Sequence, residues 1–254
     1  MPEVTVSKLD DGALWRITFS NGKGNILDCE TMTQLAAVFR QARTDALLKA
    51  ICLEGAGRHF SFGASVPEHL PSSVEGMFAA FNDLAFAMLE SDVFTIAAVR
   101  GQCLGGGLEV VTLCHRVIGD VDAMFAQPEI VLGVFAPIAS IALVDRIGRA
   151  NAEDLCVTGR SIDVGVAHGM GLVQAVDEHP ADAAIAWARE AFAARSASSL
   201  RHAVRAIRAD LTRRLRTELP ALETQYLEQL MKTADAVEGL TAFVEKRPAV
   251  WRHA

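Results

Sequence analysis

The chain has 254 residues, of which 51% are hydrophobic and 22% are charged, and its formal net charge at pH 7 is −7. These proportions are typical of a globular protein and exclude disordered, collagen-like and coiled-coil chains. A chain of this length buries enough apolar surface to fold as one full domain without disulfides. The acidic balance argues against a nucleic-acid partner, because phosphates bind clustered lysine and arginine, and against a polybasic membrane anchor.

The cysteines and the hydropathy pattern predict a compartment. Five cysteines are present, an odd number, and none has the spacing of a metal or redox motif. We therefore expect reduced thiols and no metal. The first residues lack the basic and apolar regions of a signal peptide, and no run of about 18 apolar residues predicts a membrane span. These patterns predict a cytoplasmic protein with no membrane partner.

Strands and helices alternate in the first half of the chain. Apolar runs at 4–9 and 14–19, joined by Asp10-Asp11-Gly12, predict a β-hairpin. Asp28 or Thr31 is placed to cap a helix that runs to about Arg43. The next predicted elements are a strand at 50–53, an aperiodic segment at 58–71, a helix at 74–90 and a strand at 94–99.

The second half begins with strands and ends with helices. A glycine-rich turn at 101–107 precedes a predicted helix at 108–113 and a short strand at 117–119. Beyond residue 139 the pattern is mostly helical, with a strand expected at 172–176. Alternating strands and helices indicate an α/β fold, here with a helical C-terminal third.

Two segments are placed to direct backbone N–H groups at one small site. They are residues 60–65 and the glycine-rich 102–109, which opens a helix. A helix N-terminus with bare N–H groups favours negative charge, so the site suits an oxygen that becomes an oxyanion, as a thioester carbonyl does on forming an enolate. Glu109 and Glu129 add two carboxylates, which can act as general acid and base or hold a water.

Three motifs carry a resemblance to a known family. They are Phe-Ser-Phe-Gly-Ala-Ser at 60–65, Gly-Gln-Cys-Leu-Gly-Gly-Gly-Leu-Glu at 101–109 and Ala-Gln-Pro-Glu-Ile-Val-Leu-Gly at 126–133. In order and spacing they resemble the crotonase, or enoyl-CoA hydratase/isomerase, superfamily. The resemblance implies a spiral of ββα units in residues 1–195 and a helical trimerisation region in residues 196–254. It also implies an acyl-CoA thioester substrate, no cofactor beyond that coenzyme A, and a homotrimer or hexamer.

The resemblance also assigns roles to individual residues. The N–H groups of Ala64 and Gly106 would form the oxyanion hole, and Glu109 and Glu129 would hold and activate water. Because both glutamates are present, the resemblance favours hydration over isomerisation. Contacts with the acyl group or coenzyme A are expected from Lys23, Phe62, Ser65, Val66, Phe135, Pro137, Phe243 and Lys246.

Two departures from the family pattern point to a branch within it. Ser65 stands where the family often has aspartate, and Pro137 stands where its hydratases have a glycine whose N–H helps hold the water. Residues 60–69 and 132–137 resemble the branch that hydrates cyclohexa-1,5-diene-1-carbonyl-CoA to a 6-hydroxycyclohexene-carbonyl-CoA, and Phe62 and Phe135 would suit a flat ring. The alternatives are a generic 2-enoyl-CoA hydratase, an enoyl-CoA isomerase and a catalytically silent CoA-thioester-binding protein.

Overall fold

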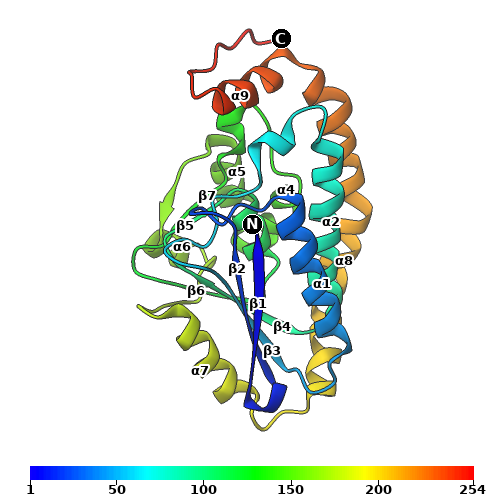
Figure 1. Cartoon of the computed structure of the whole chain (residues 1–254), viewed down its shortest axis with the longest axis vertical. Coiled ribbons are helices and arrows are strands. Elements are labelled where there is room, and N and C mark those ends of the chain that lie inside the picture. Colours follow the sequence, from blue (N-terminus) through cyan, green and yellow to red (C-terminus); the bar gives the residue numbers. More distant parts are fainter.

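A twisted sheet of six strands forms the centre of the molecule in the computed structural model, which describes all residues 1–254 (Figure 1). The strand order is β1-β2-β3-β4-β6-β9, and only the β1–β2 pair is antiparallel. The predicted hairpin is therefore confirmed. The strands are β1 (Glu3–Leu9), β2 (Leu14–Ser20), β3 (Ala50–Gly55), β4 (Phe94–Val99), β6 (Arg116–Gly119) and β9 (Ala175–Val176).

A second sheet of three short strands lies beside the first. It consists of β5 (Gln102–Leu104), β7 (Met124–Ala126) and β8 (Ile162–Asp163), in the order β5-β7-β8. Residues 102–104 were expected to be part of a turn, but Cys103 pairs with Phe125 and makes them a strand. The chain passes from β4 in the first sheet to β5 in the second, then through α3 to β6 and β7, which is the expected ββα spiral.

Nine α-helices surround these sheets. The helix predicted at 74–90 is confirmed, and Asp28 caps the helix before it by accepting the Thr31 N–H at 2.8 Å. The strand expected at 172–176 is shorter, because Leu172 and Val173 both donate to the Ala167 carbonyl. The helices are α1 (Cys29–Thr44), α2 (Val74–Glu90), α3 (Gly106–Thr112), α4 (Ala139–Ile147), α5 (Arg149–Thr158), α6 (Val164–Gly169), α7 (Pro180–Phe192), α8 (Ala197–Thr224) and α9 (Ala234–Val244).

The two faces of the large sheet bury different cores. Side chains alternate along a strand, so Trp15, Ile17 and Phe19 of β2 join the main core under α1 and α2. Leu14 of the same strand belongs to a smaller core with α7. Figure 1 shows α7 on the side of the sheet away from α1 and α2. Because both faces are covered, the sheet is a rigid support for the loops that leave its strands.

The C-terminal region lies against the same chain. Helix α8 runs along α2, and α9 lies at one end of the molecule beside the C-terminus (Figure 1). Helix α9 contacts the single-turn helices Val66–His69, which follows the motif at 60–65, and Pro128–Leu132, which lies within the motif at 126–133. None of the helices combines the length and the apolar character needed to cross a bilayer.

Candidate active site

The segment of residues 60–65 holds the Ala64 N–H free of backbone partners. The Gly63 carbonyl accepts the Leu27 N–H at 3.0 Å, and the Ser65 N–H donates to the Leu27 carbonyl at 3.1 Å. In an extended chain the N–H and C=O groups of successive residues point to opposite sides. The N–H of Ala64, which lies between Gly63 and Ser65, is therefore directed away from Leu27 and makes no hydrogen bond within the chain.

The hydroxyl group of the buried Ser61 holds this segment in place through two hydrogen bonds. The Ser61 hydroxyl donates to the Asn25 carbonyl at 2.8 Å and accepts the Gly63 N–H at 3.0 Å. The Asn25 side chain in turn donates to the carbonyls of Ala56 and His59, at 2.8 Å each. The loop that carries Ala64 is therefore tied to the loop at 21–25 by bonds that leave the Ala64 N–H available.

The glycine-rich turn brings a second N–H group to the same place. Gly106 is the first residue of α3, so its N–H has no partner inside the helix. A Cβ atom added to Gly106 would lie 3.0 Å from the Ala64 nitrogen, which shows how closely the two backbones approach. Gly105 has a φ of 52°, where a side chain is strained. Two free N–H groups that converge in this way are suited to bind an oxyanion.

Two glutamates, a buried Glu109 and a half-buried Glu129, complete the site. Glu109 lies in the first turn of α3, is 4% exposed, and accepts the Ala139 N–H at 2.9 Å on Oε1. Glu129 lies in the single-turn helix Pro128–Leu132 and accepts the Gln127 side-chain N–H at 3.0 Å. Its second oxygen, Oε2, is buried without a partner. An unpaired buried oxygen is costly, so Glu129 has an unused position for a proton or a water.

Burial raises the pKa of both carboxyl groups. The Ala139 and Ile138 N–H groups favour the charged form and partly oppose the rise in the pKa of Glu109. For Glu129 the pKa is raised by burial and then by the negative charge of Glu109. The two carboxyl groups therefore titrate as a coupled pair with raised pKa values, and the Ala139 N–H favours the charge on Glu109.

Pro137 changes which backbone N–H donors face the site. It lines the pocket together with both glutamates and cannot donate from its backbone. The N–H group of Ala139, two residues later, is directed at the Glu109 carboxylate. The start of α4 therefore binds the Glu109 carboxylate, while position 137, where the family pattern predicts a donor to water, has no N–H.

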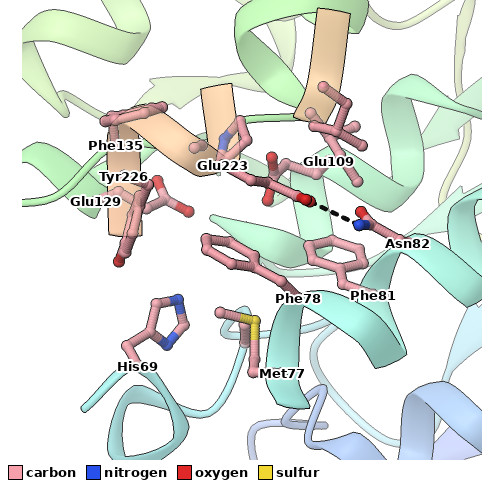
Figure 2. Close-up of a pocket in the computed structure, with 15 residues that line it drawn as sticks. His69, Met77, Phe78, Phe81, Asn82, Glu109, Glu129, Phe135, Glu223 and Tyr226 are labelled. Carbon is pink, nitrogen blue, oxygen red and sulfur yellow. Dashed lines mark hydrogen bonds between the residues drawn. The ribbon is translucent and has the colours of Figure 1, made fainter. Parts of the chain in front are cut away.

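Aromatic rings line the pocket around the glutamates (Figure 2). Phe78 and Phe81 come from the apolar face of α2, Phe135 from the loop before α4, and Tyr226 from the π-helical turn Gln225–Gln229 after α8. The Tyr226 ring packs edge-on against Phe78 at 4.9 Å and Phe135 at 5.3 Å between centroids. These rings pack against one another and form an apolar wall next to the carboxyl pair.

Four polar side chains of this pocket were not predicted from the sequence. Asn82 donates to Glu223 at 2.6 Å, and the two lie away from Tyr226 and His69 in Figure 2. The Tyr226 hydroxyl is buried without a partner. Two signals in the sequence point to these residues: Tyr226 is the single tyrosine of the chain, and Asn82 interrupts the apolar face of a helix.

Several predicted contact residues lie outside this pocket. Phe62 is 45% exposed and packs on Gly24 and on the His59 ring, 4.9 Å away. Val66 packs against the main core. The Ser65 carbonyl accepts from the His69 ring at 2.9 Å. Of the predicted residues, the structure brings Ala64, Glu109, Glu129, Phe135 and Pro137 together in the pocket, with Gly106 next to Ala64.

Three residues predicted to contact coenzyme A lie on the surface. Lys23 is exposed in the loop at 21–25. Phe243 is 55% exposed near the end of α9, and the exposed Lys246 follows that helix with a φ of 56°. In this single chain α9 packs next to its own motif at 128–132. The roles of these three residues in binding coenzyme A stay predictions.

A site with two free N–H groups beside a buried carboxyl pair is suited to acyl-thioester enolate chemistry. The chain matches a family model described as enoyl-CoA hydratase/isomerase over residues 10–254. It therefore belongs to the enoyl-CoA hydratase/isomerase family, and the expected family and mixed α/β fold are confirmed.

Individual relatives agree with this assignment. The cyclohexa-1,5-dienecarbonyl-CoA hydratase of Thauera aromatica is 46% identical over 243 residues, which cover 96% of this chain and 94% of that protein. The 2,3-dehydroadipyl-CoA hydratase of Escherichia coli is 30% identical and covers 88% of both chains. The crystal structure of an enoyl-CoA hydratase from Mycobacterium avium subsp. paratuberculosis has a TM-score of 0.83 at 25% identity and covers 98% of both chains.

Proposed function

We propose that this enzyme hydrates cyclohexa-1,5-diene-1-carbonyl-CoA. The observation that carries the proposal is the compartment lined by Phe78, Phe81, Phe135 and Tyr226 directly beside the two glutamates. Flat rings pack favourably on aromatic side chains. The identity of 46% to a hydratase of that name supports the same substrate.

The site residues have distinct roles in the proposed reaction. The thioester oxygen accepts hydrogen bonds from the N–H groups of Ala64 and Gly106, which stabilise the charge that develops when water attacks. Glu109 and Glu129 hold the water between them. Because the Ala139 N–H favours the charged form of Glu109, Glu109 is the ionised member of the pair and is available to accept the proton from the water.

The proposal extends to assembly and location. We infer a homotrimer or hexamer in the cytoplasm, a role in the degradation of aromatic compounds through benzoyl-CoA, and no cofactor beyond the coenzyme A of the substrate. Light scattering of the purified protein tests the assembly. A fully active monomer would contradict it.

The substrate is tested by a turnover comparison with mass spectrometry of the products. The purified enzyme is given the ring dienoyl-CoA and, separately, crotonyl-CoA. We expect kcat/KM for the ring substrate to be higher by at least ~10²-fold, which corresponds to about 2.7 kcal/mol of differential transition-state binding. Glu109→Gln and Glu129→Gln should each lower kcat by ~10²–10⁴.

Two results would replace the proposal with another function. Equal kcat/KM on the two substrates would identify a generic 2-enoyl-CoA hydratase. Binding of both thioesters without any turnover, measured by calorimetry, would identify a CoA-thioester-binding protein.

A further inference from the structure

Hydration of a ring diene delivers its proton to an unusual carbon. In cyclohexa-1,5-diene-1-carbonyl-CoA the α carbon carries the thioester and is flanked by the β carbon on one side and by a second double bond, between carbons β′ and γ′, on the other. Water attacks the β carbon, as in an ordinary enoyl thioester. The resulting anion extends over the oxygen, the α carbon and the γ′ carbon.

The position of the proton decides which product forms. A proton on the α carbon would leave a double bond that is not conjugated with the thioester. A proton on the γ′ carbon moves the double bond between α and β′ and keeps the conjugation, which gives the more stable 6-hydroxycyclohexene product. The γ′ carbon lies directly across the ring from the attacked β carbon. The proton donor must therefore stand at a different place from the donor that an ordinary hydratase uses at the α carbon.

The pocket contains a third carboxyl group that the glutamate pair does not include. Glu223, near the end of α8, lines the same pocket as Glu109 and Glu129. Its Oε1 accepts the Asn82 side-chain N–H at 2.6 Å, whereas Oε2 has no partner within the chain. The hydrogen bond holds the carboxyl group in one orientation and leaves one oxygen to carry a proton.

The charges of the pocket favour the protonated form of this group. Three glutamates line the pocket, and no lysine or arginine does. Burial raises the pKa of Glu223, opposed in part by the Asn82 hydrogen bond. A carboxyl group without a cation nearby keeps its proton more readily than one paired with a cation, so Glu223 is a third carboxyl group of the pocket that can carry a proton.

The other polar groups of the pocket are poorer donors. His69 donates from Nδ1 to the Ser65 carbonyl, so Nε2 carries a lone pair, and burial lowers the pKa of the ring. The pKa of Tyr226 is raised by burial and by the charges of Glu129 and Glu109, so its hydroxyl holds its proton tightly. Glu223 also lies away from both of them, on the Asn82 side of the pocket (Figure 2).

We propose that Glu223 is the acid that protonates the γ′ carbon of the ring, and that Asn82 is its positioning residue. This inference rests on the proposed substrate. In the first step the water oxygen bonds to the β carbon, one water proton passes to Glu109, and the π electrons move to the thioester oxygen. In the second step these electrons return, the α–β′ double bond forms, and Glu223 gives its proton to the γ′ carbon. Net proton transfer from Glu109 to Glu223 through solvent restores the enzyme.

The test compares Glu223→Gln with Glu218→Gln, an exposed carboxylate on the same helix without a hydrogen bond. Glutamine keeps the size of the side chain and the contact with Asn82 but has no acidic proton. We expect Glu223→Gln to lower kcat on the ring substrate by ~10²–10⁴-fold. The loss of kcat on crotonyl-CoA should be at least ~10-fold smaller than the loss on the ring substrate. Glu218→Gln should match the wild type on both substrates.

A second readout locates the proton directly. Hydration by the wild type in D2O should place deuterium on the γ′ carbon, and incubation of the product with enzyme in D2O should exchange that position. The exchange should be lost in Glu223→Gln at unchanged thermal stability. Deuterium on the α carbon, or an equal loss of kcat on both substrates, would overturn the role of Glu223 even if the ring is the substrate. A wild type that is inactive on the ring would overturn the proposed function itself, and this inference with it.

Discussion

Replacing Gly105 with alanine should disable the site without unfolding the protein. Gly105 has φ 52° and ψ −125°, a conformation that strains any residue with a Cβ atom. An added Cβ would also lie 2.6 Å from Glu129 Oε1, well inside contact distance. The carboxyl group is the end of a flexible side chain and can move, so the clash costs little stability but displaces Glu129 from its place.

The structure provides a control that separates strain from displacement. Gly148 has φ 78° and ψ 158°, also outside the range of ordinary residues, yet an added Cβ there would meet nothing within 4 Å. Both Gly105→Ala and Gly148→Ala should lose about 1–3 kcal/mol of stability from backbone strain. For a chain of this size each kcal/mol lowers Tm by roughly 2–4 °C.

Activity should distinguish the two variants. We expect Gly105→Ala to lower kcat on the unsaturated thioester by at least ~10²-fold, the lower value for losing a positioned acid or base, while Gly148→Ala keeps a rate close to that of the wild type. The assay is steady-state hydration at a temperature well below both Tm values. A Gly105→Ala enzyme within about threefold of the Gly148→Ala rate would refute the argument that Glu129 works from the position against Gly105.

Two further predictions concern the oxyanion hole and the buried carboxyl pair. Ala64→Pro removes one donor and should lower kcat by ~10²–10³, whereas Ala64→Gly keeps the N–H and should be mild; equal losses would show that Ala64 acts through packing. For Glu129 the pKa is higher in the folded chain than in the unfolded chain, so the unfolded chain releases its proton first and stability falls as pH rises towards the folded-state pKa. Glu129→Gln should therefore raise Tm more at about pH 9 than at about pH 5, and a larger gain at the acidic pH would contradict the direction of the shift.

Local patterns in the sequence account for most of the elements. Alternating apolar residues and the Asp-Asp-Gly turn were sufficient to predict the hairpin, because the contacts of a hairpin are close in sequence. The cap at Asp28 and the apolar stripe at 74–90 were sufficient to predict two helices for the same reason. Residues 102–104 were predicted as a turn because their strand depends on pairing with 124–126, about twenty residues away, and no local preference encodes that partner.

The sequence by itself determined the family. It also determined the backbone N–H donors of the oxyanion hole and the two glutamates of the motifs. The motif order identifies Ala64, Gly106, Glu109 and Glu129 because their spacing is local to each segment. Only the tertiary structure decided the rest of the pocket. Glu223 meets Asn82 across 141 positions of the chain. The polar Asn82 on an apolar helix face marks that position in the sequence, but its partner depends on how α8 packs on α2, which the whole core determines.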